Sequence, residues 1–321
     1  MTQITIGSRA RAATDARTAT KGIGRRRKPK AWWRTILFAL VALLINLPLL
    51  NAIYTSLKTD AAIGLSPFSV AGGFTFDHYA AVLSGSKYNF PGYLLNSVQL
   101  SVGTVILVMI IAVPASYAIV RTGFGGSWLL QAITSLRLVP AMFFAVPFFL
   151  IFSGLGIYDT VFGLVLANTF MQLPLALLII CGTLRDVPVE IEEASAIDGV
   201  GTYRALFSMV LPLLAPGLVA VAIIVFVFAW SDYLFAVILS ASGAVPVTVG
   251  AAFFVTSAGV QWGNLAAVTV ISIVIPLCFA FIAQRYLVRG RHQVARRLGR
   301  EALRGRRHPV QPWRSKSTAT L

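Results

Sequence analysis

The sequence has few charged residues and almost no cysteine. Charged residues make up 12% of its 321 positions, against roughly 25% in an ordinary soluble domain, so the chain does not fit a simple soluble globule. Two cysteines exclude a framework of disulfides, and Cys181 and Cys278 both lie in apolar segments, where cysteine serves as a small core residue. The three histidines, His78, His292 and His308, have no metal-binding spacing with each other or with cysteine.

The positive charge is confined to the two ends of the chain. The formal net charge is +16, but residues 1–34 contain ten Lys and Arg with one acid, and residues 285–321 contain eleven with one acid. The 250 residues between them contain six Lys and Arg and nine acids. An almost uncharged apolar body with basic ends is the composition of an integral membrane protein. Basic clusters beside membrane spans are attracted to anionic lipid, so we expect these ends to meet lipid and no nucleic acid.

Long apolar runs predict six membrane-spanning helices. A helix needs about 20 mostly apolar residues to cross the hydrocarbon core, and the runs are continuous, unlike the alternating pattern of a β-barrel. The first run is longer than the apolar region of a cleaved signal peptide and lacks a small-residue cleavage site, so we expect it to remain as a span. The expected fold class is therefore an all-α integral membrane protein. Its predicted spans are 35–57, 93–120, 130–152, 158–183, 213–239 and 265–287.

The distribution of basic residues predicts cytoplasmic N- and C-termini. Lys and Arg accumulate on the cytoplasmic side of membrane spans, and both ends of this chain are basic. The uncharged loops 153–157 and 240–263 are expected outside, and residues 185–212 inside. We expect three regions: a basic, disordered tail at 1–34, a transmembrane domain at 35–290, and a second basic tail at 291–321.

One polar cytoplasmic stretch stands out between the fourth and fifth spans. Five of the nine acids of the central body fall in it, at Asp186, Glu190, Glu192, Glu193 and Asp198. Acids at the start of a helix are stabilised by its dipole, and Pro188 suits a first turn that needs no N–H partner. Asp198-Gly199 predicts a break, because glycine readily takes the left-handed conformation that ends helices. A second short helix is expected from Thr202 to Leu211, before Pro212 and Pro216 lead into the next span.

The length and amphipathic pattern of residues 185–212 favour a role as a docking surface for another protein. A connection between two spans needs only a few residues, whereas 185–212 supplies 28 in an ordered, amphipathic segment. An amphipathic helix resting on lipid is the alternative, but its clustered glutamates would then face an anionic leaflet. We therefore expect a protein partner here.

Glu193-Ala194-Ser195, followed by Asp198-Gly199, Phe207 and Pro212, resembles the EAA motif, the cytoplasmic loop of permease subunits of bacterial ATP-binding cassette (ABC) importers. The motif usually has a second alanine where this chain has Ser195, and the exchange keeps a small side chain. Over 35–290 the chain is similar to the carbohydrate-uptake permeases, of the maltose-transporter second permease type. The segments that carry this likeness are Phe74–Tyr79, Asn96-Ser97, Ala115–Ala118 with Arg121, Pro140 with Pro147, Ala229–Asp232 and Gln284–Val288. The basic run after Gly290 departs from the family's small-residue tail.

The resemblance implies a fold, a location and partners. It implies the type I ABC importer permease fold in a bacterial inner membrane, a second permease that forms a heterodimer with this chain, an ABC ATPase dimer and an extracytoplasmic solute-binding protein. The segment that couples to the ATPase would comprise Glu190, Glu192, Glu193, Ala194, Ser195, Asp198, Gly199, Phe207 and Pro212. Closure of the ATPase dimer would push both permeases from inward-open to outward-open. The chain lacks a Gly-rich phosphate-binding loop followed by Lys-Ser or Lys-Thr, so we expect ATP and Mg²⁺ in the partner, and neither catalysis nor a cofactor in this chain.

A second set of residues is expected along the path of the transported solute. Ionisable groups inside a membrane are costly and usually face a protein interior. The candidates are Arg137 and Asp232, with Trp230 beside the latter, and Asn96 and Gln172 are weaker polar candidates. An acid beside an aromatic ring suits a sugar, whose hydroxyls bond the carboxylate while its face stacks on the ring. The alternatives are that Arg137 anchors a span by snorkelling, and that Asp232 makes a packing hydrogen bond with Ser231.

Two other classes of function compete with the importer. An ion-gradient-driven secondary transporter of a small polar solute typically has internal repeats and discontinuous helices, but no convincing repeat is visible and the EAA-like segment would have no role. A membrane-embedded enzyme would need a histidine–carboxylate or nucleophile–base cluster, which the spans do not contain. The sequence leaves the carbohydrate open between monosaccharides, disaccharides, polyols and glycerol phosphates.

Overall fold

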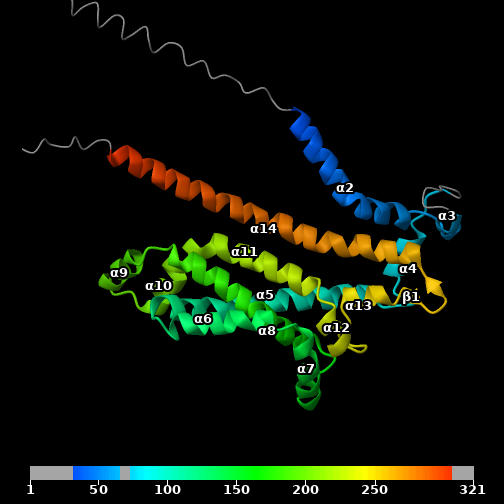
Figure 1. Cartoon of the computed structure of the whole chain (residues 1–321), viewed down its shortest axis with the longest axis horizontal. Helices are drawn as coiled ribbons and strands as arrows, with labels where there is room; N and C mark the ends of the chain where they lie inside the picture. Colours follow the sequence, from blue (N-terminus) through cyan, green and yellow to red (C-terminus); the bar gives the residue numbers. More distant parts are fainter. Residues whose placement is uncertain (1–31, 66–72, 306–321) are drawn as a thin grey trace, which may run out of the picture. The chain divides into compact units, whose positions relative to one another are not determined.

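The computed structural model describes residues 32–65 and 73–305, with all side chains in these ranges except those of Arg34 and of residues 284–305. Within these ranges the chain is helical almost throughout (Figure 1). Its elements are α2 (Trp32–Ser56), α3 (Asp60–Leu65), α4 (Asp77–Leu83), α5 (Phe90–Arg121), α6 (Gly126–Ser135), the 3₁₀ helix η1 (Leu136–Leu138), α7 (Met142–Gly154), α8 (Val161–Arg185), α9 (Glu190–Ile197), α10 (Thr202–Ala205), the π-helical turn η2 (Leu206–Val210), α11 (Leu211–Trp230), α12 (Leu234–Leu239), α13 (Val247–Ala252), β1 (Val255–Thr256), β2 (Gly259–Val260) and α14 (Trp262–Gly305). The two short strands pair antiparallel.

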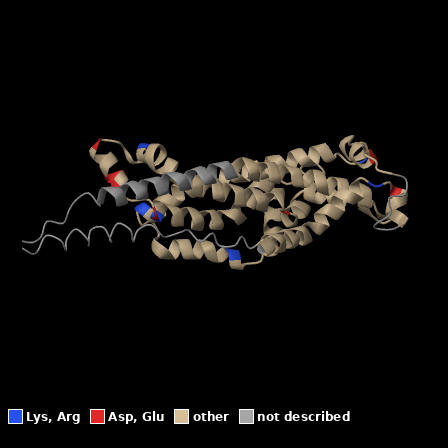
Figure 2. Cartoon of the chain, turned by 90° about the horizontal axis from the view of Figure 1, so that it is seen from above, with Lys and Arg blue, Asp and Glu red and all other residues tan. Residues whose placement is uncertain are grey.

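The apolar helices confirm an all-α chain built for a membrane. Within the described residues, five helices are long and apolar enough to span a bilayer, and the bent pair α6–α7 brings the number to six. Lys, Arg, Asp and Glu gather at the two ends of the helices in Figure 2, and the stretches between are almost free of them. The expected tails lie outside the described residues, apart from 32–34 and 291–305, so the prediction about their structure stays a prediction.

The chain divides into two units, residues 1–50 and 51–321, which are described separately. The described part of the first unit is α2 up to Leu50. Its large apolar side chains are exposed, among them Phe38 and Ile45 at 74% and 70%. From Thr35 to Leu50 the helix contains no charged residue, and an uncharged helix with an apolar surface on every side suits a span surrounded by lipid.

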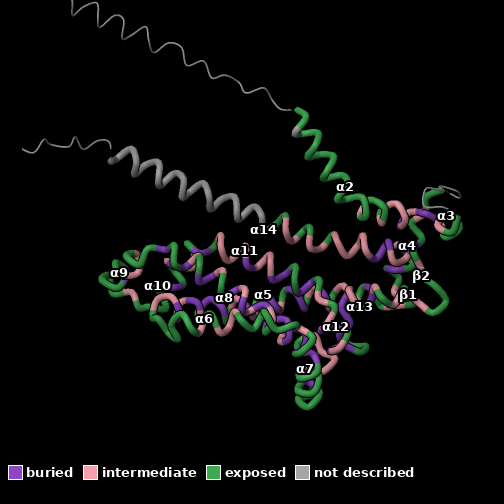
Figure 3. Tube along the Cα trace, viewed as in Figure 1, coloured by how far each residue is buried: buried purple, intermediate pink, exposed green. Residues whose placement is uncertain are grey.

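The second unit is centred on α5 and α8. These two helices make the most extensive helix–helix contact of the chain, and α11 packs against both of them and against α14. Gly103 of α5 lies directly against Val165 of α8, so that a Cβ at Gly103 would come within 2.9 Å of the valine side chain. Small residues allow membrane helices to approach closely. Figure 3 shows buried residues concentrated along α8. In the most apolar stretch of this helix, 61% of the residues are buried.

The third predicted span, 130–152, is wrong as a single helix. The helix of Gly126–Leu138 and α7 meet at an angle of 97°. Pro140 lies in the break, and Val139 before it has an extended ψ of 124°, as expected because proline disfavours helical conformation in the residue that precedes it. Arg137 therefore lies in η1, before the break.

The fifth predicted span, 213–239, is wrong at both ends. Its helix begins at Thr202 and continues through η2 into α11, so that the expected second short helix is joined to the span. Pro212 does not interrupt it, because the proline directly follows the π-helical turn η2, where the regular α-helical hydrogen-bond ladder is already broken. At the other end α11 stops at Trp230, and α12 is a separate helix.

Cysteine burial differs between the two expected core positions. Cys181 is buried in α8, as expected. Cys278 is exposed on α14, so its assignment to a core was wrong. An apolar segment in a membrane protein has a surface that faces lipid as well as one that faces the protein, and composition does not separate the two.

Candidate coupling segment and solute path

The predicted coupling segment begins with α9, whose first turn contains Glu190, Glu192 and Glu193. The amide groups of that turn favour negative charge. The predicted break is confirmed, because Gly199 has a φ of 76° and ends the helix in the left-handed conformation that glycine adopts easily. Pro188 differs from expectation, since it precedes the first helical residue by two positions.

Glu192 points into the chain and holds α9 against the end of α5. Its Oε1 accepts a hydrogen bond from Arg121 Nε at 2.7 Å, and its Oε2 accepts one from the Tyr117 hydroxyl at 2.7 Å. A further donor of Arg121, Nη2, bonds the Val187 carbonyl at 2.7 Å. The side chains of Arg121 and Glu192 are only 13% and 11% exposed, and charge-assisted hydrogen bonds in such surroundings are strong. We name Tyr117, Arg121 and Glu192 the α5–α9 clamp.

An apolar cluster packs the segment from the end of α8 to the start of α11 together. Buried side chains from the end of α8, the loop after it, η2 and α11 pack together, with Ile191 of α9 against them. The cluster consists of Leu184, Val187, Leu206, Val210 and Leu214. Ser195 is buried as well, and this burial favours a small side chain at the position. Its hydroxyl donates to the Glu192 carbonyl at 2.7 Å.

The remaining predicted coupling residues form an exposed surface. Glu190, Glu193, Ala194, Asp198, Gly199, Phe207 and Pro212 are all exposed. Three large apolar side chains lie among them, Ile197 at 88%, Tyr203 at 82% and Phe207 at 63% exposure. Exposed apolar side chains beside charged ones are typical of a protein-binding surface. We call this set of exposed residues, from Glu190 to Pro212, the coupling face.

Asp232 lies in the break between α11 and α12 and joins three elements. Its Oδ2 accepts from Asn168 Nδ2 of α8 at 3.2 Å, and its Oδ1 accepts from the Phe235 backbone N–H at 3.4 Å, at the start of α12. Its carbonyl accepts from Thr248 Oγ1 at 2.7 Å. This geometry fits the packing alternative, with Asn168 as the partner in place of Ser231.

None of the other polar candidates is a hydrogen-bond partner of Asp232 among the described residues. The guanidinium of Arg137 lies 5.9 Å from the Phe228 ring centroid. Asn96 Nδ2 donates to the carbonyls of Gly243 and Val245 at 3.2 and 3.0 Å, and so holds the loop before α13. Gln172 is buried in α8, and its Oε1 has no hydrogen-bond partner in the described part of the chain.

Trp230 lines a cavity between α11, α13 and α14. The cavity measures about 380 Å³, and four of its residues carry hydroxyl groups. We call it the hydroxyl cavity. Its lining is Trp230, Ser231, Val247, Thr248, Ala251, Val268, Thr269, Ser272, Ile273 and Pro276.

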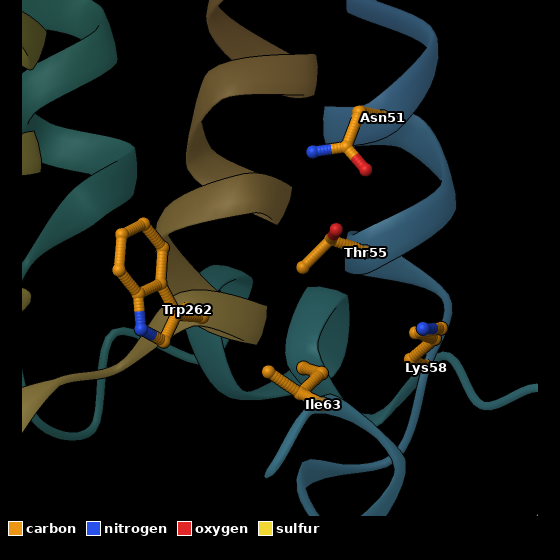
Figure 4. Close-up of a pocket in the computed structure, with 5 residues that line it drawn as sticks. All are labelled: Asn51, Thr55, Lys58, Ile63 and Trp262. Carbon is orange, nitrogen blue, oxygen red and sulfur yellow. The ribbon is translucent and has the colours of Figure 1, made fainter. Parts of the chain in front are cut away.

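A smaller cavity lies at the start of α14, beside α3 and the end of α2. It measures about 220 Å³ and is lined by Asn51, Thr55, Lys58, Ile63 and Trp262. In Figure 4 the Asn51 and Thr55 side chains extend from α2 toward the helix that begins at Trp262. Lys58 Nζ also lies 4.5 Å from the centroid of the Tyr54 ring. The cavity is thus polar on its α2 side and aromatic on its α14 side.

Asp159 binds a loop through main-chain groups, and sequence reasoning missed it. Its carboxylate accepts four backbone N–H hydrogen bonds of 2.8 to 3.1 Å from the consecutive residues 241–244. Partial burial raises the pKa of this carboxyl, but the four donors outweigh that effect and lower the pKa to about 2. The available signal was its isolation, since it is the single acid between Asp77 and Asp186.

Comparison with known proteins gives the class of this chain. Residues 109–293, more than half of the chain, match the family described as the binding-protein-dependent transport system inner membrane component, and the chain belongs to this family. Membership of a binding-protein-dependent transport family disfavours the alternative of an ion-gradient-driven secondary transporter.

Individual relatives narrow the likeness further. The chain is 32% identical to the trehalose transport system permease protein SugB of Mycobacterium tuberculosis, over 81% of this chain and 96% of the relative. It is 32% identical to the diacetylchitobiose uptake system permease protein NgcG of Streptomyces coelicolor, over 78% of this chain and 83% of the relative. It is 30% identical to the trehalose/maltose transport system permease protein MalG of Thermococcus litoralis, over 78% of this chain and 91% of the relative.

Solved structures confirm the fold. A bacterial ABC transporter involved in the import of the acidic polysaccharide alginate superposes with a TM-score of 0.64 at 19% identity, covering 89% of this chain and 99% of the other. The inward-facing MetNI methionine ABC transporter gives a TM-score of 0.51 at 17% identity, covering 62% of this chain and 94% of the other. The expected ABC importer permease fold is therefore present.

Proposed function

We propose that this chain is one of two permease subunits of an ABC importer for a carbohydrate. The observation that carries the proposal is the division of labour within α9, where Glu192 is bound inward by the α5–α9 clamp and Glu193 is exposed. A helix fixed to the bundle on one face and open on the other suits coupling to a second protein. The relatives named for trehalose, diacetylchitobiose and maltose transport support a carbohydrate as the solute.

The partners and the location follow from this function. The coupling face would contact an ABC ATPase dimer, which binds ATP and Mg²⁺ and performs the hydrolysis, while this chain binds no cofactor and catalyses no reaction. A second, different permease would complete the path, and an extracytoplasmic binding protein would deliver the solute. The α9 end and both termini would then be cytoplasmic in a bacterial inner membrane, with the basic tails at anionic lipid.

In the coupling mechanism, the clamp transmits motion from the ATPase to the helices. Closure of the ATPase dimer would move α9, and the bonds from Glu192 to Arg121 and Tyr117 would carry that displacement to α5. Because α5 and α8 pack closely along their length, a shift at one end moves both helices together. A small local displacement then changes the state of the whole path.

Reconstitution tests this function directly. The chain is purified with its partner permease and ATPase, placed in proteoliposomes with the binding protein, and supplied with a panel of labelled carbohydrates. We expect uptake of a carbohydrate that requires ATP hydrolysis and the binding protein. Uptake driven by an ion gradient without ATPase subunits would refute the proposal.

A further inference from the structure

We propose that the hydroxyl cavity is a subsite for a neutral carbohydrate along the transport path. This inference rests on the proposed function, and it narrows the solute from carbohydrates in general to uncharged ones. Three observations carry it: the broken helix beside the cavity, the hydrogen bonds of its hydroxyl groups, and the lack of charge in its lining.

The cavity lies beside an interruption in a membrane helix. α11 ends at Trp230 and α12 begins at Leu234, and both Trp230 and Ser231 line the cavity. Irregular backbone at membrane depth is tolerated where it is buried in protein or lines a polar cavity, and interrupted helices mark solute sites in transporters. Thr248 Oγ1 fixes this break by donating to the Asp232 carbonyl at 2.7 Å.

The hydroxyl groups present acceptors to the cavity. Thr269 Oγ1 donates to the Leu265 carbonyl at 2.8 Å, and Ser272 Oγ donates to the Val268 carbonyl at 2.6 Å. A hydroxyl whose proton is engaged keeps its two acceptor lone pairs. Since both groups lie one turn apart on α14, they offer closely spaced acceptors to the hydroxyl donors of a sugar, while Trp230 supplies an apolar wall.

The lining would reject a charged solute. Not one of the ten described residues around the cavity is Asp, Glu, Lys, Arg or His. The nearby carboxylate of Asp232 is committed to Asn168 and to the start of α12. A phosphate or uronate group brought here would lose its hydration without gaining a partner, which is strongly unfavourable. Glycerol phosphates therefore do not fit, whereas a volume of about 380 Å³ falls within the roughly 300–1,000 Å³ of small-molecule sites.

The experiment uses the complete complex in proteoliposomes with unmodified binding protein. Uptake is measured with labelled trehalose, maltose and chitobiose as neutral probes, and with glycerol 3-phosphate and glucuronate as charged ones. For a neutral sugar that the parent complex carries, we expect the double variant Thr269→Val with Ser272→Ala to slow uptake about tenfold while ATP hydrolysis stays within about twofold. Ser272→Phe, which fills the cavity, should abolish uptake with the same retention of ATP hydrolysis.

Thr134→Val is the matched control. Thr134 is also half-buried and its hydroxyl donates to the carbonyl four residues earlier at 2.8 Å, but it lies outside the cavity, so its uptake should stay at the parent rate. Unchanged uptake in both cavity variants would overturn the subsite, and so would ATP-driven uptake of a charged probe in preference to the neutral ones. These results leave the importer function intact, whereas the absence of ATP-dependent uptake of every probe by the parent complex would overturn both proposals.

Discussion

Two carboxylates near the two ends of α8 hold neighbouring segments in place, and they do so with different partners. Glu192, after the end of α8, is bound by the long side chains of Arg121 and Tyr117. Asp159, before its start, is bound by four main-chain N–H groups of residues 241–244. The first arrangement joins two helices through side chains that can move together, and the second fixes the path of one loop.

Under the proposed function, this difference would separate an end of the molecule that transmits motion from one that does not. A buried pair of side chains links the positions of α9 and α5, so it would affect the transport cycle whenever either helix moves. A carboxylate that is bound by several main-chain donors stabilises one loop locally, so its removal lowers the stability of the folded chain. We therefore expect variants of the α5–α9 clamp to change the ratio of uptake to ATP hydrolysis, and variants at Asp159 to change stability more than coupling.

The largest effect is expected from the coupling face itself. Glu193→Lys reverses the charge of an exposed side chain on α9, and we expect it to abolish uptake while membrane abundance stays normal, because a mismatched charge at an interface suppresses binding. Uptake and immunoblotting of membranes measure both quantities. Asp186→Lys, the same reversal at an exposed residue outside the coupling face, should transport nearly normally, and normal uptake by Glu193→Lys would defeat the coupling assignment.

Gly199 offers a second test of the same face. A Cβ at Gly199 would meet no atom within 4 Å, so the substitution is limited only by the φ of 76°. Gly199→Asp and Gly199→Asn both tolerate this conformation better than most residues, and only the first adds a charge. We expect loss of uptake for Gly199→Asp and substantial activity for Gly199→Asn. Equal loss in both variants would show that the conformation, and not the partner surface, is limiting.

A somewhat smaller effect is expected from the clamp. Arg121→Ala leaves Glu192 buried without its cation, which costs about 3 kcal/mol, and should lower uptake per ATP hydrolysed about tenfold by loosening α9 from α5. The exchanged pair Arg121→Glu with Glu192→Arg should recover part of the loss, and a double-mutant cycle gives the coupling energy between the two positions. An unchanged ratio of uptake to ATP hydrolysis in Arg121→Ala would remove the clamp from the mechanism.

The sequence predicted the apolar helices and the turn at Gly199 well, and failed where a partner or a break had to be located. Hydropathy measures composition, so the apolar runs on both sides of Ser231-Asp232-Tyr233 concealed the end of α11 at Trp230. The charges of Glu192 and Arg121 were visible, but their directions depend on how α9 packs against α5. Asp159 could not be interpreted, because its partners are main-chain N–H groups that every residue except proline possesses.

Variants of Asp232 test whether its carboxylate stabilises the helix break or binds the solute. Asp232→Ala removes the acceptors of Asn168 and of the start of α12, and it should destabilise the protein by about 1–3 kcal/mol, seen as a lower melting temperature in detergent. Asp232→Asn keeps one acceptor oxygen and should be milder. For the molecules that fold, we expect the half-saturating sugar concentration to be unchanged, and an increase in both variants would return Asp232 to the solute path.

The smallest effect is expected at Asp159 and depends on pH. Its pKa is lowered from 3.8 to about 2 in the folded chain, so the carboxylate contributes stability above pH 4 that is lost as the pH falls toward 2. Because the group is partly exposed and screened, the contribution is about 1 kcal/mol. The difference in melting temperature between the parent and Asp159→Asn should therefore be present at pH 7 and shrink as the pH is lowered from 4 toward 2, where the protonated acid resembles the amide. Comparing two proteins at each pH cancels the titration of other groups. A difference that stays constant down to pH 3 would mean that the four main-chain donors do not hold an ionised carboxylate.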